Sequence, residues 1–145
     1  MAAADFVLDN SVAMRWALPN SNSPAAHAYA NDVLDRLEDG EIARVPNLWH
    51  VEAVSVLVRA EKKGHISAAD TNRFLVFVGA LEIERDDCVA ASAVAALART
   101  HGLSGYDAVY LDLAIRCGLP LATVDEDLRK AAKASGVPLY LGGPG

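Results

Sequence analysis

Four acidic side chains occupy positions at which chemistry is common in proteins that alternate strands and helices. Asp9 and Asp125 each follow an apolar run that predicts a buried strand. Asp107 and Glu52 each lie close to the start of a predicted helix. Ligands of open α/β sheets bind outside the carboxyl ends of the strands, so these four acids are the first candidates for one shared site.

Carboxylates gathered at one point repel each other and raise each other's pKa values. A fold tolerates such a cluster when a cation neutralises it, and ligand sets made only of oxygen favour hard ions over zinc. The four acids therefore predict a site for Mg²⁺ or Mn²⁺. Asp127, two residues after Asp125, extends the same acidic group.

Three of these acids also have a purely structural interpretation. Asp9 and Asp125 each stand where a helix N-cap is expected, and the acids directly after Asp125 would complement the dipole of the next helix. Asp107 lies three residues after Ser104, which is a capping-box-like spacing. Taken alone, each of the three therefore fits a helix start as well as a ligand.

Glu52 is harder to explain as a structural residue. It is the only charged residue in the segment 45–58, and Leu48, Ser55 and Val56 flank it on the same helical face. A lone carboxylate on a buried helix costs several kcal/mol unless it is paired or holds a metal ion. The alternative is an exposed glutamate on a helix that is otherwise mostly buried.

Other common site chemistries are poorly represented. The histidines and cysteines lack the spacing of zinc ligands, and the chain has neither a phosphate-binding loop nor a dinucleotide-binding glycine pattern. Ser11 and Ser104 lack the nucleophile-elbow context of a catalytic serine. His50 is expected on a helix surface near Glu52. Cys88 and Cys117 are expected as small core residues.

Apolar periodicity and turn residues predict how these side chains are positioned. Strands are expected at 6–8, 41–45, 81–84, 119–124 and 137–141. Helices are expected at 10–18, 24–39, 48–63, 68–80, 86–100, 104–117 and 126–135. Pro19 stops the first helix before a turn at 20–23, and Asn47 is expected to cap the third. The alternation predicts an α/β fold with a parallel sheet covered on both faces, in one domain over 1–141 with a flexible tail at 142–145.

The chain has 145 residues, a formal net charge of −6, a pI of about 5.1 and a mean hydropathy of +0.18. This acidity argues against a broadly basic surface for nucleic acid, so phosphate would be bound through metal ions and local cations. The local cations are Arg15; Arg129, Lys130 and Lys133; and Arg59, Lys62 and Lys63. A cytoplasmic protein without a membrane span is expected, because the chain has no secretory signal and no apolar run of ~18 residues.

In their order and spacing, the acidic segments resemble the PIN-domain family, and within it the VapC-type toxin ribonucleases of VapBC toxin–antitoxin pairs. Residues 6–11 resemble the opening strand and the Asp-x-Ser signature. Glu52, in an aliphatic helix, is similar to the second acid of the family. Residues 103–114, Leu-Ser-Gly-Tyr-Asp-Ala-Val-Tyr-Leu-Asp-Leu-Ala, resemble the third-acid motif, and residues 121–128 resemble the fourth. The match covers nearly the whole chain.

The resemblance implies a three-layer α/β/α PIN-like fold with a central parallel sheet of four to five strands, in a protein that is usually dimeric. It also implies cleavage of RNA that depends on Mg²⁺ or Mn²⁺, and a small antitoxin protein as partner. The implied metal ligands are Asp9, Glu52, Asp107 and Asp125, with Asp127 in support. The implied hydrogen-bond donors to these ligands are Ser11 and Thr123, and the candidates for RNA contact are Arg15, Arg129, Lys130 and Lys133.

Two other functions stay open on the sequence. A phosphatase of the haloacid-dehalogenase type also uses Mg²⁺, but it needs Asp-x-Asp after the first strand, and Ser11 occupies the second acidic position. A PIN fold kept as an interaction module without catalysis is the other alternative, and the full set of acids counts against it. Asn10 and Asp112 are unusual within the motifs, although neither is a family acid.

Overall fold

The structure is a computed structural model that describes residues 3–18 and 23–145. The expected stop at Pro19 and the turn residues 20–22 lie outside this part of the chain. Within it, one sheet has the strand order β3-β2-β1-β4, and all of its pairings are parallel. The strands are β1 (Phe6–Leu8), β2 (Ala43–Pro46), β3 (Ile83–Asp86) and β4 (Leu121–Ala122). The predicted central parallel sheet of four to five strands is confirmed, with four strands.

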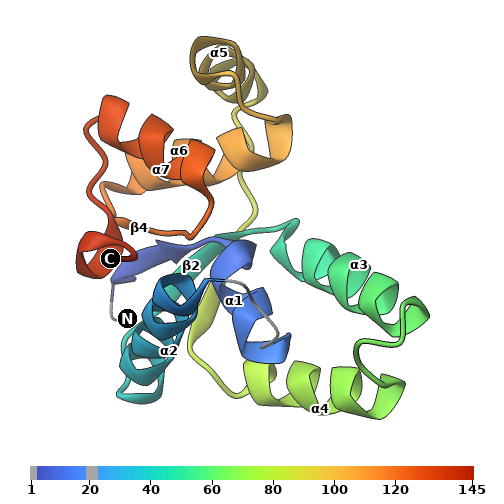
Figure 1. Cartoon of the computed structure of the whole chain (residues 1–145). Coiled ribbons are helices and arrows are strands. Elements are labelled where there is room, and N and C mark those ends of the chain that lie inside the picture. The colour runs from blue at the N-terminus through green and yellow to red at the C-terminus, as the bar shows by residue number, and fades with distance from the viewer. Residues whose placement is uncertain (1–2, 19–22) are drawn as a thin grey trace.

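Helices cover both faces of this sheet, which gives the three layers of the predicted α/β/α fold. They are α1 (Asn10–Ala17), α2 (Pro24–Glu38), α3 (Trp49–Lys62), α4 (Ala68–Gly79), α5 (Ala91–His101), α6 (Gly105–Cys117) and α7 (Glu126–Ala134). In Figure 1, α6 and α7 lie over one face of the sheet and α1 and α2 lie on the other. Helices α3 and α4 lie beside α1, farther from the sheet. None of these helices is long and apolar enough to cross a membrane.

The central position of β1 determines where the site can form. All three of its side chains are fully buried, as expected for a strand that has a neighbour on each side and helices on both faces. Val7 lies opposite Arg44 on β2 and Leu121 on β4. Asp9, the residue directly after β1, therefore lies at the middle of the carboxyl edge of the sheet.

Serine caps determine where several helices begin. Ser23, Ser67 and Ser104 each accept a hydrogen bond from a backbone N–H three residues on, at the starts of α2, α4 and α6. The start of α3 differs from the prediction, because its N-cap is Leu48 rather than Asn47 and no side chain caps it. Glu52 nevertheless falls in the first turn of α3, as the helical pattern predicts.

The segment after β3 also differs from the prediction. Asp86 was expected to start a helix, but it ends β3 opposite Pro46, and α5 begins only after a loop. Asp86 belongs to the parallel pairing of β3 with β2, and its carboxylate faces Arg44 and Arg116 and accepts a hydrogen bond from the backbone N–H of Cys88. Cys88 is exposed in this loop, so its prediction as a core residue is wrong.

The expected last strand at 137–141 is reduced to one bridge. Leu139 pairs with Leu121, and the chain then turns into the 3-10 helix η1 (Tyr140–Gly142). The ring of Tyr140 stacks on Phe6 with the ring centroids 3.9 Å apart, which ties this turn to the core. The domain boundary at 141 and the flexible tail stay predictions.

Candidate active site

Asp9 is the most deeply buried of the candidate acids, with 5% of its surface exposed. Ser11 Oγ and Thr123 Oγ1 both donate to its Oδ2 atom, over 2.6 and 2.7 Å. Burial raises the pKa of Asp9 to about 6, although the two hydroxyl groups act in the opposite direction. Two donors on one oxygen orient this carboxylate toward the site, as the partners of metal-ligating carboxylates do.

The same hydroxyl groups tie two strand ends together. Ser11 Oγ accepts from the backbone N–H of Val124, and Thr123 Oγ1 accepts from that of Asp125, both over 3.1 Å. Ser11 belongs to α1 and Thr123 follows β4, so this network holds the loop after β4 against the end of β1. Asp125 is thereby placed at the same edge of the sheet as Asp9.

Glu52 is held by a tyrosine that the sequence interpretation did not single out. The Tyr110 hydroxyl donates to Glu52 Oε1 over 2.7 Å and takes a backbone hydrogen bond from Asn10. Burial raises the pKa of Glu52, the Tyr110 hydrogen bond lowers it, and the Asp107 charge raises it further. Burial and the charges of Asp9 and Glu52 raise the pKa of Tyr110, so its hydroxyl stays a neutral donor.

Asp107 couples the acids to one another. Burial raises its pKa, and the charges of Asp125 and Asp127 raise it further. The Asp107 charge in turn raises the pKa values of both Asp9 and Glu52. The acids predicted as metal ligands therefore share one electrostatic field, although they come from four separate segments of the chain.

The structure shows which of the three candidate acids act as helix caps. Asp125 does cap α7, because its Oδ2 accepts from the backbone N–H of Leu128 over 2.9 Å. Asp9 precedes α1 but caps nothing with its side chain, so capping does not explain it. At the start of α6 the capping side chain is that of Ser104, and its hydroxyl also hydrogen-bonds the Asp107 carboxylate, so Asp107 has the capping-box-like contact that its spacing predicts as well as its place among the acids.

Family comparison adds to this geometry. A family model described as "PIN domain" matches residues 6–134. The chain belongs to the PIN-domain family. PIN domains are generally nucleases, and typically metal-dependent hydrolases. No curated protein matches the chain.

Solved structures resemble this PIN domain over most of its length. PAE2754 from Pyrobaculum aerophilum is 23% identical with a TM-score of 0.69, and the match covers 90% of this chain and 87% of that one. FitAcB from Neisseria gonorrhoeae is 20% identical with a TM-score of 0.58, over 93% of this chain and 96% of that one. At these identities the likeness concerns the fold, and it agrees with the three-layer arrangement.

The acids of this PIN domain suit a divalent cation by their chemistry. Among the described residues, no three Asp, Glu, His or Cys side chains are grouped so that they could hold a metal ion as they stand. The acids whose charges influence one another nevertheless offer only carboxylate oxygens as ligands, and hard ions prefer such oxygens. Their charges raise one another's pKa, and a cation between them would remove that repulsion. These carboxylate ligands therefore fit a divalent cation such as Mg²⁺ or Mn²⁺.

The cations predicted to contact RNA are not equally available. They are Arg15, Arg129, Lys130 and Lys133. Lys130 pairs with Glu126 over 3.2 Å on the exposed face of α7. Arg129 is partly buried and donates to the carbonyl oxygen of Pro144 over 3.3 Å. Arg15 lies in the last turn of α1, and Lys133 is exposed in the last turn of α7.

Tyr110 is the site residue that sequence reasoning missed. Its partner Glu52 lies 58 positions away in the chain, so no local pattern connects the two residues. One signal was present, because Tyr110 follows Asp107 by three positions and such residues share a helical face. A polar side chain on the buried face of α6 beside an acid was therefore a candidate partner for another acid.

Proposed function

We propose that this protein is a Mg²⁺- or Mn²⁺-dependent endoribonuclease and the toxin of a VapC-type toxin–antitoxin pair. The observation that carries the proposal is the buried Asp9, whose charge at the carboxyl edge of the sheet is coupled to those of Asp107 and Glu52. Without a cation, such an acidic cluster repels the negatively charged phosphodiester. With a bound cation, the same cluster becomes a binding site for the phosphodiester.

The chemistry follows from what each side chain does. When bound, a divalent ion neutralises the phosphodiester charge and lowers the pKa of the attacking water molecule. The side chains that would hold it are Asp9, Glu52, Asp107 and Asp125, with Asp127 in support. Ser11 and Thr123 orient Asp9, and Tyr110 orients Glu52. The hydroxyl groups of Ser11 and Thr123 both donate to Asp9, which favours water over a covalent nucleophile.

Cleavage of a structured RNA pool tests this proposal. The purified protein should cut at a small set of sites with Mg²⁺ or Mn²⁺ and stop with EDTA. Glu52→Gln should lower cleavage at least about a hundredfold while keeping the fold, because it removes a partly buried charge. Glu61→Gln, on the same helix, is the matched control and should cleave like the parent.

Two results would overturn the assignment. Hydrolysis of small phosphomonoesters without RNA cleavage would indicate a phosphatase. No turnover of either substrate, together with harmless overexpression of the chain, would indicate an interaction module.

The proposed partners are an RNA substrate, a small antitoxin and a second copy of the chain, all in the cytoplasm. Apolar side chains that face solvent on α4 support a protein partner, since Val76 is 76% exposed. Any small reading frame found immediately upstream of the gene should, on co-expression, yield a complex that no longer cleaves RNA. Recovery of an active, unpartnered chain from that co-expression would count against the toxin assignment.

A further inference from the structure

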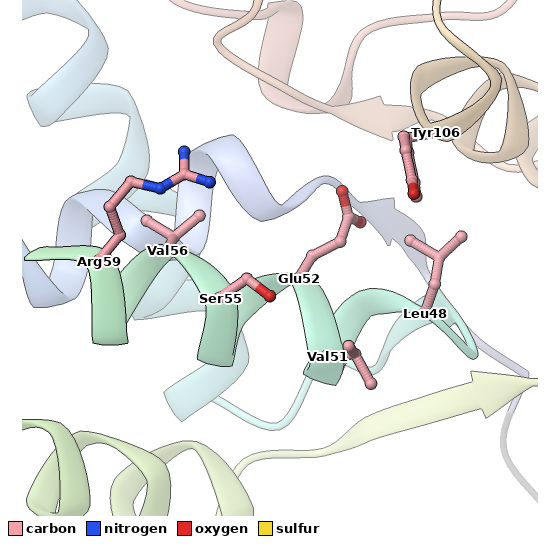
Figure 2. Close-up of a pocket in the computed structure, with 7 residues that line it drawn as sticks. All are labelled: Leu48, Val51, Glu52, Ser55, Val56, Arg59 and Tyr106. Carbon is pink, nitrogen blue, oxygen red and sulfur yellow. The ribbon is translucent and has the colours of Figure 1, made fainter.

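A groove of about 500 Å³ runs along α3 beside the acids. Figure 2 shows Arg59 and Val56 at one end, Leu48 and Tyr106 at the other, and Glu52 between them. Such a volume is typical of sites for small organic groups. The groove is therefore large enough to hold part of a substrate, and it needs an occupant that suits both its apolar walls and its charged ends.

The groove is continuous with the candidate active site. Glu52 lines it and also belongs to the acidic cluster through Asp107. At the far end, Tyr106 directly precedes Asp107 in the first turn of α6. A polymer bound with one phosphodiester at the acids would therefore place a neighbouring unit in this groove.

Tyr106 is an exposed aromatic ring at the edge of the groove. It is 64% exposed, and its hydroxyl makes no hydrogen bond with the described residues. Neither core packing nor a local hydrogen bond accounts for it. Unpaired nucleobases stack on such rings, and the stacking tolerates any base because every base has a π-face.

Arg59 supplies a cation at the opposite end. It pairs with no carboxylate in the part of the chain that the structure describes. It follows Glu52 by seven positions on α3, which is about 10 Å along the helix axis. A guanidinium at this separation matches a phosphate other than the one at the acids.

We propose that this groove binds a nucleobase of single-stranded RNA next to the cleaved phosphodiester, with the base stacked on Tyr106 and a neighbouring phosphate on Arg59. The inference rests on the proposed function, since it takes the acids as the cleavage site. It selects unpaired RNA, because a base within a duplex has no free face for the ring. It assigns recognition to a residue that lies outside the acidic set.

Binding of a short single-stranded RNA that carries 2-aminopurine tests the subsite directly. A probe with non-hydrolysable linkages that keep their phosphate charge prevents cleavage while Mg²⁺ is present, and its fluorescence falls when the labelled base stacks. Tyr106→Ala should remove the quenching and weaken binding about tenfold, whereas Tyr106→Trp should preserve both. Arg59→Ala should weaken binding and leave the quenching of the bound probe intact.

Controls separate the subsite from a loss of fold. Phe77→Ala removes another exposed aromatic ring, on α4 outside the groove, and should bind RNA like its parent. The Tyr106 and Arg59 variants should keep the melting temperature of the parent, and the protein should cause no further quenching when the same probe is in a duplex. RNA binding and quenching by Tyr106→Ala at the level of its parent would overturn the proposal.

The outcomes also separate the subsite from the proposed activity. A protein that binds and quenches the probe through Tyr106, yet cuts no RNA with Mg²⁺ or Mn²⁺, would support the subsite and refute the nuclease. RNA cleavage that is indifferent to Tyr106 and Arg59, with loss of a protein partner in both variants, would overturn the subsite and give the groove to that partner.

Discussion

Asp9 combines burial and charge in one side chain, which makes the stability of the metal-free protein depend on pH. Its folded-state pKa is raised from 3.8 to about 6, so between these values the folded state binds more protons than the unfolded state. The free energy of unfolding should therefore fall as pH rises from about 4 to about 6, by about 3 kcal/mol from this group. Chemical denaturation in EDTA across this range measures the effect.

Asp9→Asn provides the control for that pH dependence. An amide oxygen can accept the hydrogen bonds from Ser11 and Thr123, but it carries no charge to bury. The variant should show a flatter profile and be more stable than the parent above about pH 6. Mg²⁺ or Mn²⁺ should stabilise the parent and not the variant. Parallel pH profiles for the two proteins would contradict the role of Asp9.

Tyr110 should act on the metal site through Glu52. Tyr110→Phe keeps the buried ring but removes the donor to Glu52 Oε1, which should cost about 1 kcal/mol of stability. Because the orientation of Glu52 is also lost, we expect the Mn²⁺ concentration needed for half-maximal thermal stabilisation to rise about tenfold. Melting curves recorded over a Mn²⁺ titration measure both effects.

Tyr29→Phe is the matched control for Tyr110→Phe. The Tyr29 hydroxyl is buried and donates to the carbonyl oxygen of Tyr140 over 2.8 Å, with no acid of the site as its partner. Its loss should lower stability to a similar extent and leave the Mn²⁺ response unchanged. Equal Mn²⁺ responses in the two variants would mean that Tyr110 contributes to packing and does not act on the metal site.

Single residues differ in how far sequence alone could identify them. Asp9 and Asp107 stand in short motifs, so their place after a strand and at a helix start was readable directly. Tyr110 depends on a contact between distant segments, and the exposure of Tyr106 depends on how α3 and α6 face each other. The sequence left Asp125 with two possible roles, a helix cap or a metal ligand. In the structure Asp125 caps α7, and its charge also raises the pKa of Asp107.

At the scale of elements, α6 carries both site residues and the contacts that anchor it. Asp107 and Tyr110 lie in its first half, whereas Asp112 and Arg116 lie in its second. Asp112 is buried and accepts from Arg116 Nε over 2.8 Å, and Arg116 also reaches Asp86 at the end of β3. The Asp112 that departs from the family pattern therefore takes part in fixing α6 against the edge strand.

Removing one partner from this anchor should cost more than removing the other. Arg116→Met leaves the buried Asp112 carboxylate unpaired, so we expect a loss of about 3 kcal/mol, the low end for buried pairs because Arg116 is partly exposed. Asp112→Ala leaves Arg116 paired with Asp86 and should cost about 1 kcal/mol or less. Urea denaturation of both variants measures the difference. A larger loss for Asp112→Ala would contradict this account.

The elements that sequence misplaced are those whose bounds depend on distant partners. The start of α5 was set too early because Asp86 fits a helix start locally, yet Arg44 and Arg116 hold it in β3. The last strand is reduced to one bridge, and the chain turns at once into η1, where the Tyr140 ring packs on Phe6. Helices with local serine caps, such as α2, α4 and α6, could be placed from sequence because their start signals are local.

At the scale of the whole molecule, the alternation of strands and helices was enough to predict the parallel sheet and its layers. Parallel strands need crossover connections, and crossovers by helices cover both faces, so the order of elements restricts the architecture. The same topology brings the ends of β1 and β4 together. Residues more than a hundred positions apart therefore meet at the site, as the hydrogen bond from Thr123 to Asp9 shows.

The net charge of −6 makes a prediction for RNA binding by the whole protein. Because the chain is acidic overall, RNA binding should depend on the metal ion and a few local cations, so the salt dependence should correspond to about two to four phosphate contacts. Arg59→Ala should lower the slope of log K against log salt by about 0.7, the value for one contact to a single strand. Arg73, which is paired with Asp70 on α4, is the matched control, and Arg73→Ala should leave the slope unchanged. Fluorescence titrations of a single-stranded RNA over a range of salt concentrations measure these slopes. A slope that corresponds to about six contacts or more would mean that a broad basic face binds the RNA, which would contradict the prediction made from the net charge.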